Sequence, residues 1–227
     1  SLKKMMTPHT VVVIENHYLG AILNANQFDT FYHEHPRTYS YNSFVHIARS
    51  LKSQLLDVEF SSRYGGNIRV FIGNYGSNGT DGVAGKEDVK VSEKDFIKKF
   101  TLLRNNIENW RIVKKDIIET QISKYGKIRA KAFPGRAAIL VKLLGLNEEM
   151  ISAVYEKPGS LKIGNYVPGT RIPICSDNEL FALPEKTLPL LNLAWHIPNE
   201  IRNYLIERGY TGPIIDILDV NDFASAH

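Results

Sequence analysis

Two imidazoles, a carboxylate and a phenol stand side by side in the segment Phe28-Asp29-Thr30-Phe31-Tyr32-His33-Glu34-His35. A strand would divide these four polar side chains between its two faces. A buried helical turn would remove most of them from water without partners. Pro36 follows at once and disfavours the α region for the residue before it. The segment is therefore predicted to form a loop at the rim of a pocket, and loops carry function more often than cores do.

The residue types in this loop suit proton transfer. An imidazole titrates near neutral pH, and a neighbouring carboxylate can fix its tautomer. Glu34 and His35, with Tyr32 beside them, are a candidate set for general acid–base chemistry. The alternative interpretation of the same residues is a polar surface turn without a chemical role.

Length, composition and charge set the broad class. The chain has 227 residues, of which 43% are hydrophobic and 23% charged, enough for one large or two small domains with real cores. Its net charge is +4, and the lysines and arginines are spread along the chain. A nucleic-acid-binding protein would gather them in a patch, so no nucleic-acid partner is expected. A mild positive charge suits an anionic small substrate.

Cysteine content and hydropathy exclude further classes. Cys175 is the one cysteine, which excludes an internal disulfide and a cysteine-cluster metal site, and no metal site is predicted. No apolar run approaches the length of a membrane span. The first six residues lack the apolar core of a signal peptide. A soluble, cytoplasmic protein without a membrane partner is predicted.

The loop is predicted to belong to an α/β domain at the start of the chain. Residues 10–14 form a β-branched run, TVVVI, that is typical of a buried parallel strand. Asn16 and His17 follow this run, at the strand end where α/β folds bind their ligands. No neighbouring strand precedes it, so the first domain is predicted to be open on one side. A short helix is expected over residues 18–24.

Two further patterns follow the loop. Residues 43–53 have helical apolar spacing, with Ser43 as the expected N-cap. Residues 55–60 and 67–72 alternate between apolar and polar. The Gly65-Gly66 break between them predicts an antiparallel hairpin with a plain turn.

A loop and a long helix are predicted next. Residues 73–90 are rich in Gly, Asn and Asp, which indicates a loop, and segment 76–79 is at most a weak match to a phosphate-binding loop. Residues 92–125 are predicted to form one amphipathic helix that begins at Ser92 and connects two domains. Its expected buried face is formed by Phe96, Phe100, Leu103, Ile107, Trp110, Val113, Ile117 and Thr120.

The second half of the chain alternates between strand and helix patterns. Strands are predicted over residues 127–132, 154–156, 188–194 and 213–218. Helices are predicted over residues 137–144, closed by Gly145, and over residues 198–208. This alternation predicts an α/β domain with a mainly parallel sheet.

Several motifs stand in the order found in a known family. They are Tyr18-Leu19-Gly20, Phe28-Asp29, Tyr32-His33-Glu34-His35, Gly65-Gly66-Asn67-Ile68-Arg69, the segment KIGNYVPGTRIPI at 162–174, and Leu193-Ala194-Trp195-His196 with Glu200-Ile201. Together they resemble the C-terminal part of the SAM-dependent sugar C-methyltransferases. These enzymes methylate a carbon of a nucleotide-linked keto-deoxysugar. The resemblance covers nearly the whole chain.

The resemblance implies a fold and a domain order. Residues 1–90 would be the C-terminal remnant of a class I methyltransferase domain, an incomplete sheet with a β-hairpin. Residues 91–125 would form the connecting helix, and residues 126–227 a Rossmann-like, mainly parallel α/β domain. The expected substrate is a nucleotide sugar, and the implied process is deoxysugar biosynthesis. The oligomeric state is not indicated.

The resemblance also implies roles for single residues. The reaction would be deprotonation next to a ketone, which gives an enolate that attacks a methyl group. His35 is the expected base, Glu34 its orienting or substrate-binding partner, and Tyr32 a hydroxyl donor to the sugar. Four further residues are expected to bind substrate because of their positions or charge. Asn16 and His17 stand at a strand end and would line the same pocket, and Arg69 and Arg136 would contact phosphates. The alternative for each arginine is a solvated surface residue.

Two departures from the family change what is expected of this chain. Residues 130–137 read AKAFPGRA where the family has a glycine-rich turn, which weakens the expectation of a nucleotide there. The family's SAM-binding loop and its zinc-binding cysteines lie outside these 227 residues. SAM is thus expected for a full-length protein but not for this chain, which is predicted to be inactive alone. The chain would be a fragment of a longer enzyme or a natural stand-alone protein. The alternative function is a non-catalytic Rossmann-like module that binds a nucleotide sugar or another anionic small ligand.

Overall fold

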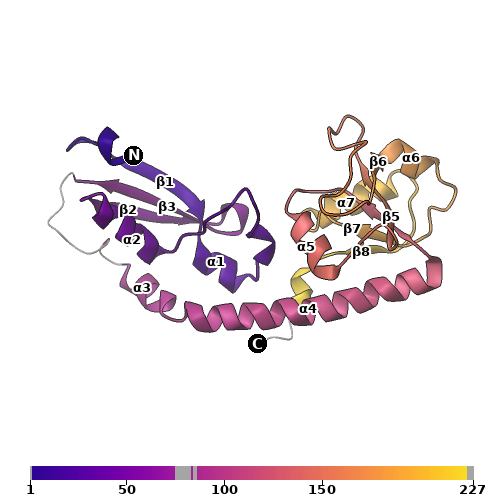
Figure 1. The fold of residues 1–227 in the computed structure, drawn as a ribbon, viewed down its shortest axis with the longest axis horizontal. Helices are drawn as coiled ribbons and strands as arrows, with labels where there is room; N and C mark the ends of the chain where they lie inside the picture. Colours follow the sequence, from indigo (N-terminus) through magenta and orange to yellow (C-terminus); the bar gives the residue numbers. More distant parts are fainter. Residues whose placement is uncertain (1, 75–82, 84–85, 224–227) are drawn as a thin grey trace. The chain divides into compact units, whose positions relative to one another are not determined.

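The computed structural model describes residues 2–74, 83 and 86–223. It divides into two compact units, Ser1–Asn105 and Asn106–His227. Each unit contains one β-sheet with helices packed against it, as Figure 1 shows. The helix α4 (Phe96–Tyr125) contributes residues to both units.

The first unit contains a three-stranded sheet with the order β1-β3-β2. The strands are β1 (Val12–His17), β2 (Gln54–Ser61) and β3 (Asn67–Gly73), and β3 runs antiparallel to both neighbours. The predicted hairpin is confirmed. Its turn contains the short 3-10 helix η3 (Arg63–Gly65), followed by Gly66. Gly66 has a φ of +125° and a Cβ there would lie 2.4 Å from the Ala21 Cβ, so only glycine fits this turn.

The prediction of a buried parallel strand over residues 10–14 is wrong. β1 pairs antiparallel with β3, and Val13 on its outer face is 53% exposed. A β-branched run indicates a strand but neither its direction nor its burial, because both depend on distant partners. Asn16 and His17 are part of this strand, whereas they were expected beyond its end.

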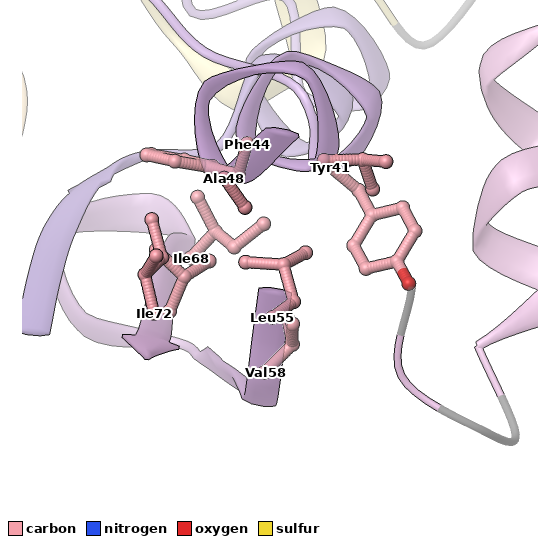
Figure 2. Packing of buried hydrophobic residues seen from close by; sticks show 9 residues of the cluster. Tyr41, Phe44, Ala48, Leu55, Val58, Ile68 and Ile72 are labelled. Carbon is pink, nitrogen blue, oxygen red and sulfur yellow. The ribbon is translucent and has the colours of Figure 1, made fainter. Parts of the chain in front are cut away.

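The helix α2 (Tyr41–Ser50) covers one face of this sheet and forms the core of the unit (Figure 2). Its N-cap is Ser40, which accepts the backbone N–H of Ser43 at 3.1 Å. The predicted N-cap, Ser43, is wrong by three residues. Ser43 is the third residue of the helix, and its side chain accepts the backbone N–H of Ser40, which completes a capping box. The core consists of Tyr41, Phe44, Val45, Ala48, Leu55, Val58, Ile68, Val70 and Ile72.

Short elements complete the first unit. They are η1 (Leu2–Met5), α1 (Leu19–Asn24), η2 (Phe28–Thr30) and α3 (Glu87–Glu93). The predicted loop over residues 73–90 is wrong at its end, where α3 begins, and its segment 76–79 lies outside the described residues.

The predicted helix over residues 92–125 is two helices. Ser92 lies inside α3, and α4 begins at Phe96 after a break at residues 94–95. The buried positions of α4 are Leu103, Asn106, Trp110, Lys114 and Ile118. Phe100, Val113, Ile117 and Thr120, predicted to be buried, are exposed. The buried face instead includes Lys114, whose Nζ pairs with Asp222 Oδ1 at 3.0 Å. Apolar spacing alone could not reveal this.

The second unit contains a five-stranded parallel sheet with the order β6-β5-β4-β7-β8. Its strands are β4 (Ile128–Lys131), β5 (Ile151–Glu156), β6 (Ile174–Ser176), β7 (Leu190–Asn192) and β8 (Ile214–Asp216). The predicted alternation and parallel sheet are confirmed. In sequence order the strands read 3-2-1-4-5, the arrangement of a doubly wound fold.

The helices of this unit are α5 (Ala137–Leu144), α6 (Asp177–Ala182) and α7 (Pro198–Ile206), followed by η4 (Val220–Phe223). The bounds of α5 and its left-handed Gly145 cap agree with the prediction. The helix α6 was not predicted. It has six residues, which is too short for a visible helical period. None of the helices in the described ranges is long and apolar enough to cross a bilayer.

Candidate active site

The segment Phe28–His35 is held in place by its first three residues. Phe28, Asp29 and Thr30 form η2 and are buried, and the Thr30 hydroxyl donates to the Gln27 carbonyl at 2.8 Å. The chain then turns outward, and the His35 backbone N–H donates to the Tyr32 carbonyl at 2.9 Å. The segment predicted as a loop is therefore a short turn. Its first residues are buried and fixed, and its polar residues lie at the surface.

This turn borders an open pocket of about 440 Å³ in the first unit. The pocket is lined by Leu19, Phe31, Tyr32, His35, Pro36, Arg37, Thr38 and Phe100. The far end of the loop is fixed where the Leu19 N–H donates to the Tyr39 carbonyl at 3.0 Å. The volume falls in the range of small-molecule sites. The lining offers an imidazole, a phenol and a guanidinium around aromatic walls.

The polar side chains of the loop contact one another in a defined pattern. The Tyr32 hydroxyl donates to Glu34 Oε2 at 2.6 Å. The Tyr32 ring meets the His35 ring edge-on, with ring centroids 5.4 Å apart. No hydrogen bond joins Glu34 to His35 among the described residues. Glu34 therefore orients Tyr32 in this conformation, and Tyr32 in turn contacts the imidazole.

His17 is brought to the same place from β1. Its ring stacks on that of His35 with centroids 5.5 Å apart and an interplanar angle of 25°. A stacked ring restricts rotation of the neighbouring imidazole, so His17 has the geometry of a residue that positions His35. Sequence alone placed both residues near one pocket but did not predict their contact.

Asn16 and Arg69 lie elsewhere in the first unit. Asn16 and His17 are consecutive in β1, so their side chains lie on opposite faces of the sheet, and Asn16 lies on the face that packs against the core. Its buried Oδ1 has no hydrogen-bond partner there. Arg69 lies on the outer face of the sheet and pairs with Glu15 at 2.7 Å and Glu59 at 3.0 Å. The hydrogen bonds that the Arg69 guanidinium donates to Glu15 raise the pKa of Arg69. Neither residue lines the pocket.

Arg136 belongs to the second unit. Its guanidinium lies 4.8 Å from the ring centroid of Trp195, whose ring meets His196 edge-on. Partial burial, together with the Arg136 charge, lowers the pKa of His196. This cluster follows the carboxyl end of β7. Arg136, Trp195 and His196 were all noted in the sequence, and the structure brings them together as a cation–aromatic cluster.

Arg37 is the pocket residue that the sequence analysis missed. It lines the pocket beside His35 and has no ion-pair partner among the described residues. The sequence offered one indication that Arg37 could be functional, namely its position two residues after His35 in a loop with predicted function. A single arginine in a chain with 28 basic residues carries little information without the pocket.

The turn between β4 and α5 is filled by groups of the chain itself. Phe133 is buried in it, its N–H donates to Glu156 Oε1 at 2.7 Å, and Lys162 Nζ donates to its carbonyl. Ala132 holds a left-handed φ of +59°. The Phe133 side chain thus fills the turn, and Glu156 at the end of β5 is already bound to the Phe133 backbone. These residues do not fit SAM.

Within the described ranges, no group of three or more His, Cys, Asp or Glu side chains has the spacing to hold a metal ion.

The fold and the motifs define a class of protein. A family model for the C-methyltransferase C-terminal domain matches residues 62–212, which is most of the chain, and the chain belongs to this family. The match includes the hairpin turn and the segment 162–174 but not the pocket residues 31–38.

A curated relative extends the likeness. The chain is 25% identical over 201 residues to a C-methyltransferase, NovU, from Streptomyces niveus. The alignment covers 87% of this chain and 47% of NovU, so the chain spans about half the length of that relative. Methyltransferases as a class use SAM.

Proposed function

We propose that this chain supplies the substrate half of a C-methyltransferase that acts on a nucleotide-linked keto-deoxysugar. The observation that carries the proposal is the pocket in which His35 is held between Tyr32 and His17, with Arg37 beside it. These groups provide a base, a phenol hydroxyl and a cation for an anionic substrate. The family membership and the likeness to NovU support the reaction class.

The proposed step is removal of a proton from the carbon next to the ketone. The C–H bond breaks, its proton passes to an imidazole nitrogen of His35, and the electron pair moves to the carbonyl oxygen as an enolate. A positioned base contributes typically 10²–10⁴-fold to such a step. In this conformation the one hydrogen of the Tyr32 hydroxyl is donated to Glu34, so the Tyr32 oxygen accepts a hydrogen bond from a sugar hydroxyl. Arg37 is free to pair with a phosphate oxygen.

The step can be tested without a methyl donor. The chain is incubated in D₂O with a thymidine-diphosphate-linked keto-deoxysugar, and NMR follows deuterium uptake at the carbon next to the ketone. His35→Ala should lower the exchange rate by at least about 100-fold. His33→Ala is the matched control, because His33 is exposed and adjacent but outside the pocket lining.

Equal exchange rates in the two variants would remove His35 as the base. Binding of the sugar nucleotide with no exchange by the unmodified chain would favour the alternative, a module that binds a nucleotide sugar without chemistry. A heat signal on titration with SAM would contradict the inference that this chain does not hold the cofactor.

A further inference from the structure

A second pocket lies in the parallel-sheet unit. Its volume is about 300 Å³, at the lower end of the range for small-molecule sites. It opens at the amino ends of β4, β5 and β7, the edge opposite to the one where doubly wound folds bind their ligands. Its lining consists of Tyr125, Lys127, Ile128, Arg129, Ser152, Tyr155, Leu183, Leu188 and Pro189.

Arg129 brings a buried positive charge to this pocket. The residue is only 9% exposed, which is rare for arginine unless it is paired. Its guanidinium donates to the Glu185 backbone carbonyl and, at 3.2 Å, to Glu185 Oε2. The Glu185 side chain is 55% exposed, so this carboxylate can leave for solvent at little cost. A ligand carboxylate could take its place on the guanidinium.

Tyr155 offers a hydroxyl that its own unit does not use. The residue is 7% exposed and lines the pocket, and its hydroxyl has no hydrogen-bond partner among the described residues. The hydroxyl is not one of the fully buried polar atoms without a partner, so its oxygen keeps contact with solvent at the pocket, where a ligand can reach it. The hydroxyl of the neighbouring Tyr210 is used within the unit instead, since it donates to the Leu188 carbonyl at 2.6 Å. Burial also raises the pKa of Tyr155, which keeps its hydroxyl protonated as a donor.

The remaining walls are mainly apolar. Ile128, Leu183, Leu188 and Pro189 present aliphatic surface, and Tyr125 also lines the pocket. Lys127 at the rim pairs with Glu149 at 3.3 Å, and both of these side chains are largely exposed. The pocket therefore combines one buried cation and one unpaired donor with an apolar body, which is the usual composition of a small-molecule site.

We propose that this pocket binds a small carboxylate with an apolar or aromatic body. The ligand carboxylate replaces that of Glu185 on Arg129 and accepts a hydrogen bond from Tyr155, while the apolar body contacts Leu183, Leu188 and Pro189. Such a site is independent of the proposed base and sugar pocket, which lies in the other unit.

The experiment is an NMR titration of the ¹⁵N-labelled chain with benzoate and with hexanoate. Benzyl alcohol and inorganic phosphate are the comparison probes. Saturable shifts of the Ile128, Ser152 and Leu188 amides with either carboxylate are expected. Benzyl alcohol, which lacks the charge, and phosphate, which lacks the apolar body, should bind at least about tenfold more weakly.

Two variants keep the test informative without disturbing the core. Tyr155→Phe removes only the unpaired hydroxyl and should weaken carboxylate binding about fivefold. Glu185→Gln removes the competing carboxylate and should tighten binding about two- to fivefold. Glu207→Gln removes the same charge from an exposed position directly after α7, outside the pocket lining, and should leave binding unchanged.

The proposal is overturned if neither carboxylate gives saturable shifts at these amides. It is equally overturned if benzyl alcohol or phosphate binds as tightly, or if Glu185→Gln fails to tighten binding. Shifts that gather instead at Arg136 and Trp195 would assign the carboxylate to a different site.

Discussion

Arg37 and His35 face the same pocket, yet their side chains are set by different constraints. His35 is held by ring contacts with His17 and Tyr32. Arg37 is exposed and has no ion-pair partner in the described part of the chain. An arginine without an internal carboxylate beside a candidate base is available for an anionic group of the substrate.

Arg37→Gln should therefore weaken binding of a nucleotide sugar about tenfold or more, because a hydrogen bond to a charged group is lost. The affinity should also become less dependent on salt. Isothermal titration at low and moderate ionic strength measures both effects. The control is Arg49→Gln, which removes the same charge from α2, outside the pocket. If this variant weakens binding equally, Arg37 contributes only to the overall positive charge of the protein and does not contact the substrate.

At the scale of elements, Glu93 joins three segments of the first unit. It is 8% exposed at the end of α3. Its carboxylate accepts the backbone N–H of Tyr41 at 2.6 Å and of Asn42 at 3.0 Å, at the start of α2. The Tyr18 hydroxyl donates to the same carboxylate at 3.1 Å, and the pKa of Tyr18 is raised by burial and by this charge. A carboxylate at a helix N-terminus is favoured by the helix dipole as well.

Glu93→Gln should lower the free energy of unfolding by about 2 kcal/mol, because the amide lacks the charge and presents an N–H₂ to backbone donors. Urea denaturation followed by circular dichroism gives the change. Glu87→Gln, in the exposed first turn of the same helix, should change stability by less than about 0.5 kcal/mol. Similar losses of stability in the two variants would mean that Glu93 stabilises the protein only through its negative charge and not through these hydrogen bonds.

In the described part of the molecule each unit has a hydrophobic core of its own. In the second unit a buried ion pair lies on the sheet, with Lys131 Nζ 2.9 Å from Asp177 Oδ2 and both side chains 1% exposed. The Tyr204 hydroxyl also donates to Asp177 at 2.7 Å. Burial lowers the pKa of Lys131, so the folded chain holds this proton less tightly than the unfolded chain does. Asp177 offsets part of that cost.

Lys131→Met should destabilise the second unit by about 3–5 kcal/mol, because it leaves the Asp177 charge buried and unpaired. The double variant Lys131→Met, Asp177→Leu should recover most of this loss. Hydrogen exchange should show loss of protection in β4–β8, while β1–β3 stay protected because they have their own core. Lys142→Met, on an exposed face of α5, is the control. A double variant as unstable as the single one would show that the pair itself stabilises the sheet.

Local patterns in the sequence were enough to predict several elements. The hairpin of β2 and β3, the helix α5 with its Gly145 cap and the alternation that builds the parallel sheet are set by neighbouring residues, through period and turn chemistry. The ordered motifs from Tyr18 to Ile201 were also sufficient to recognise the family, which the match over residues 62–212 confirms.

Other features depend on partners far away in the chain, and only the tertiary structure decided them. β1 is antiparallel because β3 pairs with it, and Lys114 is buried because Asp222 neutralises it. The stacking of His17 on His35 brings together residues that are 18 positions apart, and the pocket around Arg129 and Tyr155 joins strands separated by a whole helix. Period and composition describe what a residue prefers, whereas contacts of this kind arise from which surfaces fold against each other.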